Sequence, residues 1–146
     1  MTVALSPQEL ANRIGEQLPE AVVEAQETAL FVKSDSLLDV ARFLKSTPNL
    51  DFNLLVSISA IDYLEYFELV YHLTSITHNH SIVLKTRCDD RDKPTVPSVS
   101  GLWRGANFQE REIYDLMGIS FSGHPNLKRI VLWEGFEGHP LRKDYL

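Results

Sequence analysis

Residues 52–60 read Phe-Asn-Leu-Leu-Val-Ser-Ile-Ser-Ala. An alternation of this kind, with a period of two, is typical of a β-strand that buries one face. The side chains predicted to face the core are Phe52, Leu54, Val56, Ile58 and Ala60. The pattern returns at 67–73 after a break at 62–65, and again at 82–86 after a polar turn. Three strands with short breaks predict an antiparallel meander.

Two stretches before the meander have apolar residues at helical spacing. The first opens with Ser6-Pro7-Gln8-Glu9, a capping box with proline at the first helical position, and it ends before Pro19. The second begins at Ser36, which can cap the helix, and ends at Thr47-Pro48. The apolar positions are Leu10, Ile14 and Leu18 in the first stretch and Leu37, Ala41 and Leu44 in the second. These two helices can cover the apolar face of the meander.

Further elements complete the expected fold. Short strands are expected at 21–24 and 28–33, and a last helix from Asn107 to Met117 has Asn107 and Glu110 at capping spacing and Gly118 as its stop. The fold class is therefore α+β. We expect a single domain with an antiparallel or mixed sheet, covered by two N-terminal helices, with one further helix and an irregular C-terminal tail. The core would span 1–118, and 119–146 would form an extended docking tail of the same domain unit.

Charge and composition exclude several classes of protein. The formal net charge is −6 and the basic residues are dispersed, which argues against a nucleic-acid binder. No apolar run approaches the roughly 20 residues that cross a bilayer. The first ten residues lack a basic group and an apolar run, so we expect no signal or transit peptide. The single cysteine, Cys88, cannot hold an iron–sulfur cluster, which needs about four thiolates, and we expect it to be a packing residue.

The last third of the chain differs from the rest. It holds both tryptophans, Trp103 and Trp133, together with several charged residues and two Gly-His-Pro turns. Aromatic residues and arginine are enriched at the centres of protein interfaces. We therefore expect this region to be a docking surface that other chains complete. The alternative is that it wraps back on its own domain.

Residues 110–115 could also carry chemistry. They read Glu-Arg-Glu-Ile-Tyr-Asp, so Arg111 and Asp115 stand four apart on one helix face. The carboxylates of Glu110, Glu112 and Asp115 could serve acid–base catalysis, but an ion-pair network on a helix explains the spacing better. Neither His124 nor His139 has a further ligand at zinc spacing, so no metal site is expected. No glycine loop of the dinucleotide or phosphate-binding type is present either.

A longer pattern carries a family resemblance. The run Phe108-Gln109-Glu110-Arg111-Glu112-Ile113-Tyr114-Asp115-Leu116-Met117-Gly118-Ile119, followed by Phe121 and by Gly123-His124-Pro125-Asn126-Leu127-Lys128-Arg129-Ile130, resembles the signature of the C subunit of NADH–quinone oxidoreductase (respiratory complex I). The same family includes the J subunit of the photosynthetic NAD(P)H–plastoquinone oxidoreductase. The closing run from Glu137 to Tyr145 is similar to the family's end motif. The resemblance is strong over about residues 50–146.

The resemblance implies a role and a set of site residues. It implies a non-catalytic structural subunit in the peripheral arm of a proton-pumping complex that passes electrons from NADH through FMN and Fe–S clusters, held in other subunits, to quinone. This chain would hold no cofactor of its own. The implied signature or subunit-interface residues are Glu110, Arg111, Glu112, Tyr114, Asp115, His124, Pro125, Lys128, Arg129, His139, Pro140, Arg142 and Lys143.

The implied partners are protein chains. They are the D subunit, which holds the quinone site, and neighbouring cluster-bearing arm subunits, on the cytoplasmic side of an inner or photosynthetic membrane. Contact with the membrane would be indirect. Many relatives run past the position of Leu146, so the resemblance leaves open any contact that such an extension makes. Two rival hypotheses stay open: an enzyme that uses Glu110, Glu112 and Asp115 as acid–base groups, and a free-standing adaptor unrelated to respiration.

Overall fold

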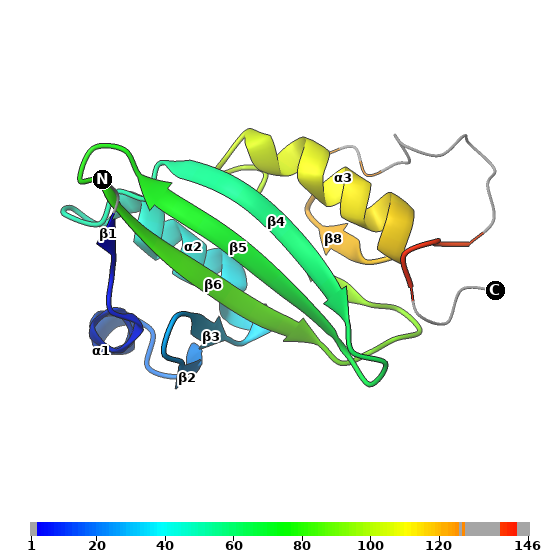
Figure 1. Ribbon diagram of the computed structural model, residues 1–146, viewed down its shortest axis with the longest axis horizontal. Helices are drawn as coiled ribbons and strands as arrows, with labels where there is room; N and C mark the ends of the chain where they lie inside the picture. The colour runs from blue at the N-terminus through cyan, green and yellow to red at the C-terminus, as the bar shows by residue number, and fades with distance from the viewer. Residues whose placement is uncertain (1–2, 126, 128–137, 143–146) are drawn as a thin grey trace.

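A three-stranded antiparallel meander forms the centre of the molecule (Figure 1). The computed structural model describes residues 3–125, 127 and 138–142. The strands are β4 (Leu54–Asp62), β5 (Phe67–Ser75) and β6 (His80–Cys88). Each pairs with the next over nearly its whole length, which confirms the predicted meander.

Three short strands extend the sheet on the other side of β6. They are β1 (Val3–Ala4), β2 (Val22–Ala25) and β3 (Leu30–Val32). Both β1 and β3 run parallel to β6, and the order of the main path is β2-β3-β6-β5-β4. The sheet is thus mixed, and β4 forms one of its edges.

Two helices cover one face of this sheet, as expected. The first, α1 (Pro7–Gln17), is capped by the Ser6 hydroxyl, which accepts a hydrogen bond from the N–H of Glu9. The second, α2 (Leu37–Ser46), follows a 3₁₀ turn, η1 (Ser34–Ser36). The predicted capping role of Ser36 is wrong. Ser36 has helical backbone angles at the end of η1, and its side chain makes no capping hydrogen bond.

The first half of β4 presents the opposite face from the one we predicted. Leu54 and Val56 were expected in the core, but they are 41 % and 55 % exposed, while Leu55 is buried. The cause is a β-bulge between Leu55 and Ser57, which shifts the pairing register with β5. One extra residue in a strand reverses the faces on either side of it. Beyond the bulge, Ile58 is buried as predicted.

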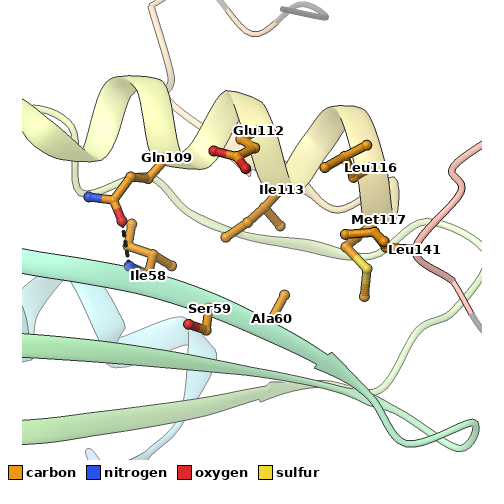
Figure 2. A pocket seen from close by; sticks show the side chains of 9 residues that line it. All are labelled: Ile58, Ser59, Ala60, Gln109, Glu112, Ile113, Leu116, Met117 and Leu141. Atoms are coloured by element: carbon orange, nitrogen blue, oxygen red, sulfur yellow. Dashed lines mark hydrogen bonds between the residues drawn. The ribbon is translucent and has the colours of Figure 1, made fainter. Parts of the chain in front are cut away.

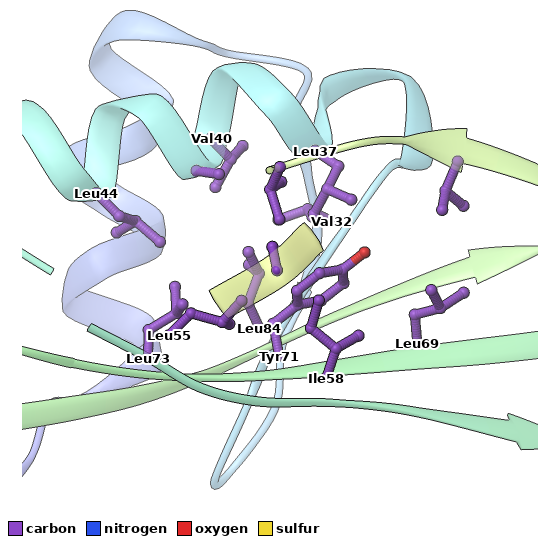
Figure 3. Packing of buried hydrophobic residues seen from close by; sticks show 14 of the residues in the cluster. Val32, Leu37, Val40, Leu44, Leu55, Ile58, Leu69, Tyr71, Leu73 and Leu84 are labelled. Atoms are coloured by element: carbon purple, nitrogen blue, oxygen red, sulfur yellow. The ribbon is translucent and has the colours of Figure 1, made fainter. Parts of the chain in front are cut away.

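The apolar core lies between the helices and the inner face of the sheet (Figure 3). Tyr71, at the centre of β5, stands opposite Leu84 of β6 and Ile58 of β4. Leu37, Val40 and Leu44 of α2 close this layer from above.

A third helix and a small second sheet complete the core. The helix α3 (Gly105–Met117) packs against β4, and the strands β7 (Thr95–Pro97) and β8 (Ser120–Ser122) pair in parallel. The predicted stop at Gly118 is confirmed, since this residue has a left-handed conformation. The predicted capping box is wrong: α3 begins two residues before Asn107, and Glu110 is directed into the core.

Residues just after Gly118 belong to the core. Ile119 and Phe121 are buried in the same apolar cluster as the meander. The docking tail that we placed at 119–146 therefore begins with residues that pack on their own domain. A docking role for the remainder stays a prediction.

Candidate functional site

Glu110 is a fully buried carboxyl group among the predicted site residues. None of its side chain is exposed. Its Oε1 accepts a hydrogen bond from the Ser98 hydroxyl at 2.6 Å, and its Oε2 accepts one from the Val99 N–H at 2.9 Å. Glu110 thereby connects α3 to the segment that follows β7. Sequence reasoning missed Ser98 as a partner because it stands twelve residues away in an irregular stretch.

Burial changes the acidity of this group. It raises the pKa of Glu110 from its ordinary value to about 7, against the opposing effect of the two hydrogen bonds. The hydroxyl of Tyr71 is also buried, and within the described residues it has no hydrogen-bond partner. Desolvation and, to a lesser extent, the charge of Glu110 raise the pKa of Tyr71 well above its ordinary value. A negative charge is thus unfavourable in this part of the core.

The structure brings His124 to Glu110, fourteen positions away in the sequence. The His124 side chain is also fully buried, and its Nε2 lies 3.9 Å from Oε1 of Glu110. That distance exceeds a hydrogen bond. The same Nε2 lies 3.1 Å from the Asn107 carbonyl oxygen, which can only accept, so Nε2 carries the proton. His124 thus holds the turn after β8 against α3.

The three carboxylates of the rival catalytic hypothesis do not form one site. Glu110 is directed into the core, Glu112 is exposed, and Asp115 is buried at the C-terminal end of α3. Groups that share acid–base work must reach the same reacting atom. The ion pair predicted between Arg111 and Asp115 stays a prediction. Tyr114 is half-buried and lies near His139, with ring centroids 6.3 Å apart.

Residues 138–142 contact the end of α3. The Nδ1 of His139 lies 2.9 Å from the Asp115 carbonyl oxygen, and the N–H of Leu141 donates to the Leu116 carbonyl oxygen at 2.9 Å. The His139 ring lies so close to Gly118 that a Cβ there would come within 2.7 Å of it. Residues 138–142 therefore pack on their own domain, as the alternative interpretation of the tail predicts.

Arg142 and Arg91 form a cluster around Phe67. The two guanidinium carbons lie 4.9 Å and 4.6 Å from the centre of the Phe67 ring, within cation–π distance. Arg91 makes two hydrogen bonds to the buried carboxylate of Asp62, and Arg142 donates to the Arg91 carbonyl oxygen. Sequence reasoning assigned Asp62 and Arg91 only to strand breaks, because nothing local shows that they meet.

A small hollow lies between α3 and the edge strand β4 (Figure 2). Ile113, Leu116 and Met117 line it from α3, and the Ala60 side chain points toward it from β4. At one end the Gln109 side chain accepts a hydrogen bond from the Ile58 N–H at 2.7 Å. The hollow is also lined by Ile58, Gln109, Glu112 and Leu141.

Other predicted site residues are placed as follows. Pro125 is an exposed turn residue, and Pro140 lies half-buried in the turn that contacts α3. Lys128, Arg129 and Lys143 lie outside the described residues. Within the described ranges, no three His, Cys, Asp or Glu side chains gather as a possible metal site. In the same part of the chain, no helix combines the length and apolar character needed to cross a bilayer.

Comparison with known proteins gives a family match. The family model described as the 30 kDa subunit of respiratory-chain NADH dehydrogenase matches residues 30–146. The C subunit of NADH-quinone oxidoreductase from Roseiflexus sp. (strain RS-1) is 44 % identical over 149 residues, covering 97 % of this chain and 85 % of the relative. The same subunit from Cupriavidus taiwanensis is 40 % identical, covering 93 % and 73 %.

Two solved structures share the fold. One is a chain of the membrane-bound sulfane sulfur reductase, an archaeal respiratory membrane complex, with a TM-score of 0.75 and 30 % identity over 94 % of this chain and 84 % of that one. The other is the trypsin-resistant fragment of Nqo5, with a TM-score of 0.65 and 28 % identity over 83 % and 99 %.

Proposed function

The chain belongs to the family of the 30 kDa subunit of respiratory-chain NADH dehydrogenase, and on this premise we propose that it is a non-catalytic structural subunit of a proton-pumping NADH:quinone oxidoreductase. It belongs to the peripheral arm and packs beside the D subunit, which holds the quinone site, and beside cluster-bearing arm subunits. Electrons pass through FMN and Fe–S clusters in those partners. The family resemblance carried by residues 108–130 is confirmed.

The enclosure of Glu110 and His124 carries the non-catalytic part of the proposal. These two side chains could exchange protons with a substrate, but neither has any exposed surface. Their hydrogen bonds instead join α3 to the segment after β7 and to the turn after β8. Buried polar groups that are used this way hold segments in one arrangement.

The likeness to a chain of a second kind of respiratory assembly supports a role that does not depend on the electron donor. The archaeal sulfane sulfur reductase, a respiratory membrane complex, contains a chain with this fold. A subunit that holds neighbours together can serve either assembly. The cytoplasmic side of the membrane is the location that goes with this proposal.

The test separates assembly from turnover. Glu112→Gln is the most informative variant, because Glu112 is exposed and removing its charge leaves the core intact. We expect quinone reduction per assembled complex to match that of the wild type, whatever the yield of complex. Removing the whole chain should prevent the peripheral arm from assembling. The matched control is Glu16→Gln on the exposed face of α1.

Two results would contradict the proposal. One is a complex that carries Glu112→Gln, assembles in normal amount, and has lost tenfold or more of its turnover. The other is quinone reduction, or binding of a nicotinamide, by the purified chain alone.

A further inference from the structure

The edge of β4 directs main-chain polar groups toward α3. The Ile58 N–H points away from β5, since it donates to Gln109. In an antiparallel strand every second residue directs both its N–H and its C=O to the same side. Ala60 therefore directs both groups to this edge, and the N–H of Tyr63, which bonds to Tyr66 on the β5 side, agrees with the alternation. Within the described residues these groups of Ala60 have no hydrogen-bond partner.

Gln109 shows what this edge can bind. Its side-chain amide carries the same kinds of C=O acceptor and N–H donor as a peptide group, and its oxygen accepts the Ile58 N–H at 2.7 Å (Figure 2). Ala60 lies two residues further along β4. Where the Gln109 amide lies beside Ile58, the hollow lies beside Ala60. A peptide group from another chain could pair there as the Gln109 amide does at Ile58. An unpaired strand edge is a common template for such pairing.

The hollow has the size for a side chain. Its volume is about 130 Å³. Pockets for cofactors and drug-sized ligands are typically about 300–1,000 Å³, so this one is too small for them. The apolar part of its α3 wall is formed by Ile113, Leu116 and Met117, which favour an apolar occupant, and Gln109 and Glu112 line it as well.

The surroundings of the hollow add apolar surface and one charge. Leu141, on the segment that contacts the end of α3, also lines the hollow and is 60 % exposed. Exposed apolar surface beside a hollow is typical of interaction sites. The exposed Glu112 carboxylate lines the same hollow, so a partner with Lys or Arg at that point is favoured.

We propose that the β4 edge and α3 form a docking groove for an extended segment of a neighbouring protein chain. The main chain of that segment pairs with Ala60, one apolar side chain fills the hollow, and a Lys or Arg faces Glu112. This inference rests on the proposed function, because it names how one neighbour in the assembly is held.

Ala60→Pro tests the main-chain pairing. Proline removes the outward N–H, and it is tolerated on edge strands where that N–H is not used within the sheet. Tagged wild-type and variant chains would be expressed together, and their ratio in the purified complex measured. We expect the variant to be under-represented about fivefold, the effect of one net backbone hydrogen bond. Ala60→Ser, which keeps the N–H, should be recovered equally with the wild type.

Photo-crosslinking gives a second readout that does not depend on how Ala60→Pro folds. Benzoylphenylalanine would replace Leu116, which lines the hollow, and, as the control, the exposed Ile76 in the β5–β6 turn. In the assembled complex, position 116 should crosslink to a segment of another subunit with an apolar residue next to Lys or Arg. Position 76 should not crosslink to that segment.

The outcomes distinguish the two proposals. Crosslinks from position 116 only to its own chain, to a second copy of it, or to nothing in a complete complex would overturn the groove. Equal recovery of Ala60→Pro and Ala60→Ser would also overturn it and leave the structural role standing. Failure to recover even the wild-type chain in a respiratory complex would contradict the proposed function.

Discussion

The two halves of this molecule share one core but are stabilised differently. Where α1 and α2 cover the meander, apolar contacts dominate, as at Leu84 between Leu30 and Tyr71, and the buried hydroxyl of Thr86 donates to the Val32 carbonyl oxygen. Around α3, the buried polar side chains of Glu110 and His124 hold segments together through hydrogen bonds. Apolar burial is non-directional, whereas a buried polar group needs its partner at the right distance. The apolar half should therefore respond to lost volume, and the α3 half to pH and backbone geometry.

The largest expected effect is in the apolar half. Leu84→Ala removes a side chain that is only 1 % exposed at the centre of the sheet. We expect it to lower the free energy of unfolding by about 4 kcal/mol, through lost burial and the cavity left behind. Val83→Ala, one residue away on the outer face, is the control and should cost less than about 1 kcal/mol. Denaturant unfolding of both variants measures the difference, and equal losses would contradict this picture of the core.

The next effect should depend on pH. Because Glu110 titrates near 7 in the folded protein but near 4.5 when exposed, the folded state holds an extra proton between these values. Its contribution to stability is full below pH 4.5 and is lost as pH rises through 7, a change of about 3 kcal/mol. Glu110→Gln keeps a neutral amide for Ser98 and Val99, so it should lack this loss and be the more stable chain at pH 8.

Unfolding free energies of both chains from pH 4 to pH 9 check this prediction. Subtracting the unfolding free energy of Glu110→Gln from that of the wild type at each pH cancels the contributions of the other titrating groups. What remains is the contribution of Glu110. Parallel curves across that range would mean that Glu110 binds protons equally in the folded and the unfolded chain, so that burial does not raise its pKa.

The smallest effect should come from backbone geometry at the end of α3. Gly118 has φ +78°, and a Cβ there would meet the His139 ring. Gly118→Ala should cost about 2 kcal/mol for the left-handed conformation and displace His139 from the Asp115 carbonyl. Gly101→Ala meets nothing within 4 Å and should change stability little. Thermal unfolding of the two variants, with the His139 ring signals followed by NMR, tests both parts.

Much of the sheet and the helices followed from local patterns. The alternation at 67–73 and 82–86 predicted β5 and β6, and the capping box at Ser6 predicted the start of α1. These succeed because a strand or helix with one buried face repeats its apolar residues with the period of its own geometry. The long spaced run from Phe108 to Ile130 likewise identified the family without any structure.

Contacts between distant segments did not follow from any local pattern. The bulge that turns Leu54 and Val56 outward is a matter of register with β5, and the partners of Glu110 lie on two other segments. The same holds for Arg91 with Asp62 and for the hollow beside Ala60. Each arises only when the packed core brings the segments together. Pairing distance and burial are properties of the folded chain, and no run of neighbouring residues encodes them.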